Sequence, residues 1–447
     1  MSANAAPEGG IDLEEALDRL SLKGRPLWVV VIMAAVLIAD GFDIILLGFV
    51  APAVAEEFGL SHGGIGAVLT ASLLGVALGG FLGGYYGDRK GRRTLVAACL
   101  LVFGGATIAS ALVDDIVLFS ITRLIAGLGL GGATPNAAAL MTEMLPSRWR
   151  SQIITIAYAS STIGTTLAGL LARQMLPDWG WRGLFLAGGI LPLAICLFVF
   201  LLVPESPKYL VSLKDGSARA AKALNRLMGH AAYSAGDRFR VPSASGKGSF
   251  ADIVSPAYRR DTICLALMIF MILFSWVALG NWGTIVLTSL GHDMQSAVSV
   301  MMGYNLAGLG GAVAVAFLLN RLGSRRIFAA LAVTGIVTTA ALGLALDAGP
   351  VSLGVMTVGI LITGAALTAL LQASYPVVAN AYPTDFRALG LGSTFGFGRL
   401  GAVTSSMVTA VLMTKGGAPL FFMGIAAASF CVLLAVLAVR RHVAPAA

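Results

Sequence analysis

The sequence predicts an all-α integral membrane protein of twelve transmembrane helices, arranged as two pseudo-symmetric halves of six helices each. Three observations predict this class: a low content of charged residues, twelve long apolar runs, and two motifs that recur in both halves. Of the 447 residues, 57% are hydrophobic and only 12% are charged, whereas soluble proteins average about 25% charged residues. Because so little charge cannot cover a surface in water, lipid must solvate much of the chain.

The apolar runs define the domain organisation. A helix needs about 20 apolar residues to cross a hydrocarbon core of about 30 Å. Runs of this length lie at 27–53, 65–86, 94–112, 116–142, 152–175 and 182–202, and again at 262–288, 296–319, 327–346, 351–375, 389–413 and 419–439. The chain therefore divides into an N-terminal tail (1–26), a first six-helix half (27–203), a central loop (204–260), a second six-helix half (261–439) and a C-terminal tail (440–447).

The basic residues predict the orientation of the chain. If both tails and the central loop are cytoplasmic, 25 of the 30 Lys and Arg residues fall on that side, because only Arg173, Arg182 and Lys415 fall outside and Arg123 and Arg399 lie within spans. This asymmetry follows the positive-inside rule, and it explains the net charge of +8 without a nucleic-acid partner. We therefore expect a multi-pass protein of a bacterial inner membrane, with both termini in the cytoplasm.

The central loop contains the one long polar stretch, Lys208–Arg260. Within it, Ser217–Met228 is predicted to be a helix, since Arg219, Lys222 and Arg226 recur at helical spacing among alanines and leucines. Such a helix is either an amphipathic helix at the membrane surface or part of a basic linker along the inner leaflet. The loop lacks a recognisable output domain, which disfavours a membrane sensor that would signal through it.

Two motifs recur with nearly the same offset. Gly87–Arg93 (Gly-Asp-Arg-Lys-Gly-Arg-Arg) follows the second run, and Asn320–Arg326 (Asn-Arg-Leu-Gly-Ser-Arg-Arg) follows the eighth, with Asn320 in the place of Asp88 at an offset of 232 residues. Glu143–Arg150 follows the fourth run and Asn380–Arg387 follows the tenth, at an offset of 237 residues. Two matches in register predict duplicated halves, which in transporters rock around a central site to give alternating access.

Four ionisable residues lie within predicted spans: Asp40, Asp43, Arg123 and Arg399. Each costs about 2.5 kcal/mol or more to place in a bilayer, so each is a candidate functional residue. Asp40 and Asp43 are three residues apart and share a helix face. Two carboxylates this close cannot both ionise at low cost in a low-dielectric setting, so the pKa of at least one should rise toward neutral. A carboxyl group of that kind can take up and release protons, and we therefore expect the pair to couple transport to protons. The alternative is a structural ion pair between the acids and Arg123.

The two arginines predict an anionic cargo. Arg123 lies at a depth comparable to that of the acids and can pair with Asp43 when no cargo is bound. Arg399 lies midway through the eleventh run, and no acid of the second half lies at the same depth. A guanidinium binds a carboxylate through two parallel hydrogen bonds, so the cargo can supply the missing charge. The alternative is a backbone carbonyl partner that holds a helix kink.

These residues resemble those of a known family. Gly87–Arg93 matches the cytoplasmic loop signature of the major facilitator superfamily, and Asp40–Pro52 is similar to the first span of its aromatic acid:proton symporter family, as are Phe397–Gly401 and Trp282–Thr284. Pro204–Lys208 also resembles the sugar-porter signature. The resemblance implies the major facilitator fold and proton-driven import of an aromatic carboxylate of the benzoate or hydroxybenzoate class. A sugar, an organic cation or another organic acid is the alternative cargo.

The resemblance implies further site residues. An aromatic cargo needs flat apolar walls and polar contacts for ring hydroxyls; the candidates are Phe42, Trp282, Tyr304, Phe395 and Phe397 for the walls and Asn281, Asn305 and Gln372 for the hydroxyls. Packing or interfacial anchoring is the alternative for the aromatic residues. Charges at the cytoplasmic helix ends are candidate gating residues: Asp88, Arg89, Arg92, Arg93, Glu143, Arg150, Arg321 and Arg387. For Glu143 we expect salt bridges with nearby arginines such as Arg148 and Arg150, and ordinary helix-end charges are the alternative.

Other motifs in the sequence are less informative. Gly127–Gly132 imitates a dinucleotide-binding loop, but it lies within an apolar run without a preceding strand. The four histidines, His62, His230, His292 and His442, lack the spacing of metal ligands. We therefore expect no enzymatic activity, no cofactor and no metal. The expected partners are a small aromatic carboxylate, protons and membrane lipid, and the chain is expected to be monomeric.

Overall fold

The computed structural model describes residues 10–213, 216–240, 250–383 and 387–442, except for the side chains of Asp88, Ser151, Thr155, Ala159, Phe250, Ala251, Asn320, Arg387 and Ala388. The described chain is almost entirely helical, with one two-stranded parallel pairing of short strands. Within it, ten helical stretches are long and apolar enough to cross a membrane. The predicted all-α class is therefore confirmed, and ten of its helical stretches are candidate membrane spans.

The elements follow one another along the chain in a simple order. The first part contains β1 (Ile11–Asp12), α1 (Leu13–Asp18), α2 (Arg25–Glu57), α3 (His62–Lys90), α4 (Arg92–Leu112), α5 (Ile116–Met144), α6 (Ser147–Ala159), α7 (Ser161–Leu202), α8 (Pro207–Ser212), α9 (Ser217–Met228) and β2 (Phe239–Arg240). The second part contains α10 (Phe250–Ile253), α11 (Arg259–Ser289), α12 (Met294–Leu322), α13 (Ser324–Ala348), α14 (Leu353–Ala381) and α15 (Arg387–Ala438).

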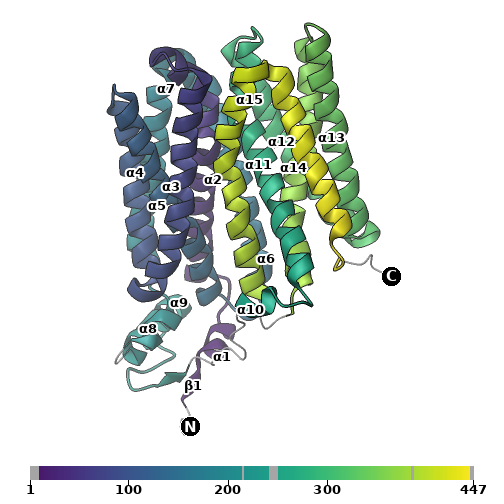
Figure 1. The fold of residues 1–447 in the computed structure, drawn as a ribbon. Helices are drawn as coiled ribbons and strands as arrows, with labels where there is room; N and C mark the ends of the chain where they lie inside the picture. The colour runs from purple at the N-terminus through teal and green to yellow at the C-terminus, as the bar shows by residue number, and fades with distance from the viewer. Residues whose placement is uncertain (1–9, 214–215, 241–249, 384–386, 443–447) are drawn as a thin grey trace. The chain divides into compact units, whose positions relative to one another are not determined.

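The helices α7 and α15 are long because each continues through a turn. Gly180 in α7 has φ 62° and ψ −171°, and Gly417 in α15 has φ 61° and ψ −153°. Glycine adopts positive φ without the steric cost that other residues incur. Both glycines lie between two predicted apolar runs, and Figure 1 shows α15 turning back at its upper end. The sequence pattern therefore located these turns correctly.

The chain forms two compact units. Unit 1 contains the described residues of Met1–Asp43, Leu74–Gly164 and Arg182–Ala244, and unit 2 contains those of Ile44–Leu73, Thr165–Trp181 and Ser245–Ala447. The helices α2, α3 and α7 contribute to both units, since parts of them pack with second-half helices within unit 2. For example, the Thr284 hydroxyl on α11 donates to the Gly48 carbonyl on α2 at 2.6 Å.

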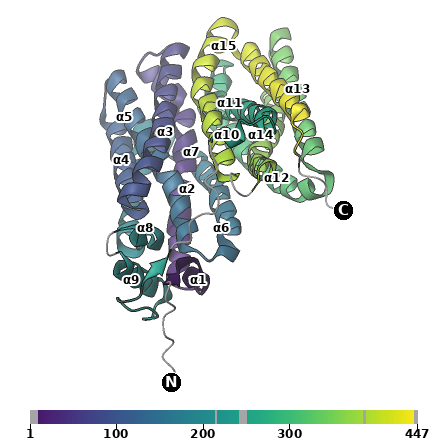
Figure 2. The same cartoon turned by 60° about the horizontal axis from the view of Figure 1, so that its bottom comes forward.

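Unit 1 is held together by close helix contacts and by elements at one end. A Cβ atom on Gly164 of α7 would overlap the carbonyl oxygen of Ile38 on α2, so α2 and α7 pack backbone to backbone there. Figures 1 and 2 show α1, β1, α8 and α9 gathered at one end of the long helices of this unit. There, Ile11 and Asp12 of β1 pair with Phe239 and Arg240 of β2.

The helix predicted over Ser217–Met228 is present as α9. Its apolar residues pack in the core of unit 1 together with residues of α1 and of the long helices; those of α9 are Ala220, Ala221, Leu224 and Leu227. Its basic residues Arg219, Lys222 and Arg226 are exposed. The interpretation of this helix as one that buries its apolar face in the membrane surface is therefore wrong, because that face is covered by protein.

Candidate functional site

A buried ion pair joins α2 and α5 inside unit 1. Asp115 caps α5 by accepting the Leu118 N–H at 2.8 Å, so the helix begins two turns before Arg123. The Arg123 side chain is fully buried, and its Nη2 donates to both oxygens of Asp43 at 2.8 Å each. Asp43 is 3% exposed. The two opposite charges therefore neutralise each other in the core.

The remaining surroundings of Arg123 are mostly apolar. Its Nη1 lies 3.5 Å from the Thr107 hydroxyl, and its guanidinium carbon lies 5.1 Å from the centre of the Phe185 ring. Its Nε has no hydrogen-bond partner within the described chain. Asp43 is therefore the only anionic group that the described residues bring to this guanidinium.

Asp40 lies one turn before Asp43 in a different environment. It is partly exposed, and one of its oxygens accepts a hydrogen bond from the Thr134 hydroxyl of α5 at 3.0 Å. Phe42, two residues further on, is buried where α2 packs against α7 near Gly164. The two acids thus differ in accessibility, although they share a helix face. The sequence motif alone did not distinguish them.

Four candidate residues of unit 2 are buried in α11 and α12. Trp282 and Tyr304 have no exposed surface, and Asn281 and Asn305 are 3% and 4% exposed. Tyr304 donates its hydroxyl to the Trp276 carbonyl at 3.3 Å, and Asn305 donates to the carbonyl one turn earlier. The indole N–H of Trp282 has no acceptor within the described chain.

A second group of candidates lies on α14 and α15. Phe395 stacks on Tyr375 with ring centres 4.1 Å apart and an angle of 13° between the planes. Gln372 and Arg399, each about one turn from this stack on its own helix, are partly buried. Arg399 makes no hydrogen bond or ion pair with the described residues, and Phe397 is 47% exposed. A cation and an amide thus each lie about one helical turn from a stacked aromatic pair.

Sequence reasoning missed Tyr375. The available signal was its position three residues after Gln372, which places both on one face of the predicted helix.

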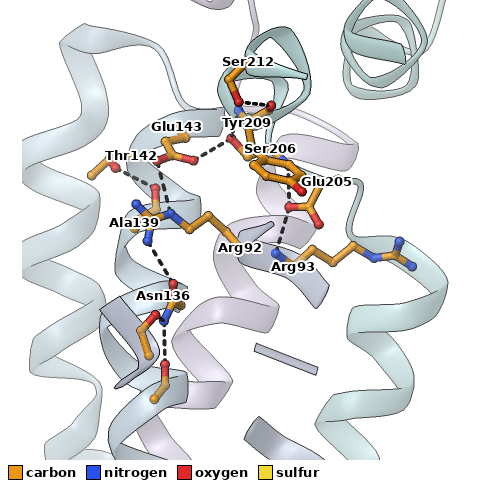
Figure 3. Close-up of polar contacts among 12 residues, drawn as sticks. Arg92, Arg93, Asn136, Ala139, Thr142, Glu143, Glu205, Ser206, Tyr209 and Ser212 are labelled. Atoms are coloured by element: carbon orange, nitrogen blue, oxygen red, sulfur yellow. Dashed lines mark hydrogen bonds and ion pairs between the residues drawn. The ribbon is translucent and has the colours of Figure 1, made fainter. Parts of the chain in front are cut away.

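Charged residues at one end of unit 1 form the Arg92–Glu143 network (Figure 3). Arg92 Nε lies 3.4 Å from Glu143 Oε1, and its Nη1 donates to Asn136 at 3.0 Å. Asn136 in turn donates to the Gly83 carbonyl at 2.9 Å, and the Ser206 hydroxyl donates to Glu143 at 2.5 Å. The network therefore ties α3, α4 and α5 to the segment after α7.

Glu205 caps α4 from a distance in sequence. The residue before α4 is Gly91, which has no side chain to cap the helix. Glu205 accepts the backbone N–H of Arg93 at 2.9 Å and that of Thr94 at 3.3 Å. The Arg93 side chain points away from the network (Figure 3) and donates to the Phe200 carbonyl at 2.7 Å. The Pro204–Lys208 motif, which contains Glu205, did not by itself indicate this contact.

The other gating candidates have separate partners. Arg150 pairs with Glu14 of α1 at 3.1 Å, so the expected pairing of Glu143 with Arg150 is replaced by pairing with Arg92. Arg89 lies over the Tyr85 ring, and Arg321 is exposed at the end of α12. The side chains of Asp88 and Arg387 lie outside the part of the chain that the structure describes.

The sequence matches a family model and several named transporters. The model of the family described as Major Facilitator Superfamily matches residues 32–360. The chain is 32% identical to the gallate transporter of Pseudomonas putida over 433 residues, which is 96% of this chain and 95% of that protein. It is 29% identical to the 4-hydroxybenzoate transporter PcaK of Pseudomonas putida, over 91% of this chain and 90% of that protein.

A gentisate transporter of Corynebacterium glutamicum is 28% identical over 92% of this chain and 90% of its own length. Among solved structures, a D-xylose-proton symporter superposes with a TM-score of 0.75 at 17% identity, covering 95% of this chain and 99% of that one. The inward-open xylose transporter XylE from E. coli gives 0.72 at 17% identity, over 93% and 96%. The predicted major facilitator fold is confirmed by this agreement.

The buried ion pair generates a stability prediction. Arg123→Gln or Asp43→Asn alone leaves an uncompensated buried charge, which costs about 3–5 kcal/mol. The double variant should recover most of that loss, because no unpaired charge then remains. Thermal unfolding of the purified protein in detergent measures both effects.

The matched control is the exposed pair of Arg182 and Asp114, which are 2.6 Å apart with side chains 32% and 89% exposed. Exposed pairs contribute about 1 kcal/mol or less, so Arg182→Gln should change stability little. Equal losses from Arg123→Gln and Arg182→Gln would contradict the structural importance assigned to the buried pair.

Proposed function

Because the chain belongs to the major facilitator superfamily, we propose that it imports an aromatic carboxylate of the benzoate or hydroxybenzoate class together with protons. Its relatives are named as transporters, so the chain is a transporter and not an enzyme. The observation that carries the proposed cargo is the similarity, over 96% of the chain, to a gallate transporter. The 4-hydroxybenzoate and gentisate transporters support the same class of cargo.

The proposal includes a membrane topology. The fifth span (152–175) runs from α6 into α7, the sixth follows the turn at Gly180 in α7, and α15 crosses the bilayer twice with its turn at Gly417. Together with the other long helices this gives twelve spans, with two six-helix halves at 27–203 and 261–439. The ends of the chain and the Arg92–Glu143 network then lie on the cytoplasmic side of a bacterial inner membrane, in agreement with the distribution of basic residues.

The buried ion pair supports a coupling mechanism. When Asp43 takes up a proton, Arg123 loses its counter-ion, and a buried guanidinium without an anion is unfavourable. A carboxylate of the cargo can then replace Asp43 through charge-assisted hydrogen bonds. When the cargo leaves, Asp43 loses its proton and the ion pair forms again. The proton and the anion therefore bind together.

Asp40 is proposed as the entry point for the proton. It is partly exposed, whereas Asp43 is buried, and the two residues lie one turn apart on the same face of α2. A proton accepted by Asp40 from water can thus pass to Asp43. The hydroxyl of Thr134, which donates to Asp40 at 3.0 Å, holds the carboxylate in place.

Arg399 of unit 2 is proposed as a cation that recognises the cargo carboxylate. Its guanidinium has no anionic partner among the described residues, and the Phe395–Tyr375 stack lies about one helical turn away. A flat ring and a carboxylate on the same small molecule match an aromatic surface next to a cation. Gln372 adds an amide that can meet a ring hydroxyl.

An uptake experiment tests the proposed function. We expect cells or proteoliposomes that contain the protein to accumulate at least one radiolabelled compound among benzoate, 4-hydroxybenzoate, gallate and gentisate. A protonophore should abolish the accumulation, since the proton gradient drives it. Accumulation of a neutral sugar and of none of these acids would contradict the proposed cargo, and accumulation that ignores the protonophore would contradict the proton coupling.

The assignment of Arg399 makes a separate prediction. Arg399→Gln should weaken carboxylate binding about tenfold or more, because a hydrogen bond to a charged group contributes about 1.5–3 kcal/mol. Binding of the transported acid to the purified variant measures this directly. Lys415→Gln removes the same charge from an exposed position of the same helix and should leave affinity unchanged. Equal affinities of Arg399→Gln and the unmodified protein would remove Arg399 from the binding site.

A further inference from the structure

The residues before the first long helix form a folded strap, defined here as Gly10–Leu20. Its strand β1 pairs with β2 of the central loop, and its helix α1 follows directly. The apolar side chains of α1 and of the residue that ends the strap are 1–3% exposed and lie in the core of unit 1; they are Leu13, Ala16, Leu17 and Leu20. The strap is therefore packed into the unit as part of its core.

The strap caps α6. The residue before this helix is Pro146, which provides no capping side chain. Instead, Asp18 accepts the backbone N–H of Ser147 at 2.6 Å and its hydroxyl at 2.8 Å. The first amides of a helix lack acceptors within the helix, and its N-terminus favours a negative charge. The hydrogen bond from the Ser147 amide lowers the pKa of Asp18, so this carboxylate is charged at neutral pH.

Two further contacts join the strap to the first turn of α6. Arg150 donates to Glu14 at 3.1 Å, and Arg148 donates to the Leu20 carbonyl at 3.5 Å. Just before α6, Glu143 at the end of α5 belongs to the Arg92–Glu143 network. The turn between α5 and α6 is thus held on both sides.

The other end of α6 is fixed separately. Ser160, which links α6 to α7, has helical dihedral angles (φ −64°, ψ −19°), and its hydroxyl lies 2.5 Å from the Ala157 carbonyl of its own helix and 3.3 Å from the Ala34 carbonyl of α2. Immediately after it, Ser161 and Gly164 of α7 pack against the α2 backbone at Gly41 and Ile38. Between its ends, α6 buries Ala157 and exposes Ile156, which is 69% exposed. The first turn of α6 is therefore held by the strap, and its last turn by the packing of the start of α7 against α2.

We propose that Asp18 and the strap are positioning elements for transport, which hold α6 so that it moves with α2 and α5 as one body. Asp18 acts through Ser147 and contacts no cargo in this scheme. Without the cap, the first turn of α6 frays, and the helix spends time in positions that do not advance the cycle. The effect on transport rests on the proposed function, whereas the capping of α6 by Asp18 does not.

The first test is amide hydrogen exchange of the purified full-length protein without cargo. In Asp18→Ala, the amides of the first turn of α6 should exchange about fivefold faster, because an N-cap contributes roughly 1 kcal/mol. Asp18→Asn retains an acceptor oxygen and should restore slow exchange. Asp237→Ala removes a carboxylate that accepts a backbone N–H from Ser234 at 2.8 Å elsewhere in unit 1, and it should leave α6 unchanged. Unchanged exchange of α6 in Asp18→Ala would overturn the capping assignment.

The second test is transport by the same variants in proteoliposomes. Asp18→Ala should lower the maximal rate about twofold or more with the cargo Kd unchanged, because conformational steps set many turnover rates. Asp18→Asn should recover the rate, and Asp237→Ala should match the unmodified protein. Faster exchange with an unchanged maximal rate would overturn the positioning role. If no aromatic acid is transported by the unmodified protein, the proposed function fails while the exchange result still decides whether the strap caps α6.

Discussion

The buried pair of Arg123 and Asp43 is the constraint on which the proposed mechanism depends. A guanidinium without exposed surface needs an anion at all times, since an uncompensated buried charge costs about 3–5 kcal/mol. In the structure Asp43 is that anion, at 2.8 Å from Nη2. If Asp43 is protonated, the cargo must provide the negative charge. Under the proposed mechanism, electroneutrality at this one buried site links proton uptake to anion binding, and no separate signal between distant sites is required.

A second theme is that two helices are capped by carboxylates from distant parts of the chain. The residues that precede α4 and α6 are Gly91 and Pro146, and neither supplies a capping side chain. Glu205 caps α4 across 112 residues, and Asp18 caps α6 across 129 residues. The segment after α7 and the N-terminal strap thereby become parts of the helical unit. These two carboxylates thus stabilise the ends of helices within unit 1.

Much of the fold was predictable, because apolar runs determine where long helices form and glycines allow the turns between them, and both signals lie within short stretches of sequence. The apolar runs predicted the long helices, and the polar gaps between runs marked the turns at Gly180 and Gly417. The polar partners were harder to predict. The proximity of Glu143 to Arg150 in sequence favoured a pair that the structure replaces with Arg92, because the choice depends on how α4 packs against α5. The stack of Phe395 on Tyr375 likewise depends on the contact between two helices, which residue spacing within one helix cannot reveal.

The most direct test of the central claim is the pH dependence of cargo binding to the unmodified protein and to Asp43→Asn. If a proton and the cargo bind together at this pair, as proposed, the affinity of the unmodified protein for the aromatic carboxylate should rise as pH falls. In Asp43→Asn, Arg123 is released at every pH, so affinity should be high and nearly independent of pH, and the cargo should raise the Tm of this variant more than that of the unmodified protein. The same pH dependence in both proteins, or loss of binding in Asp43→Asn, would contradict the account.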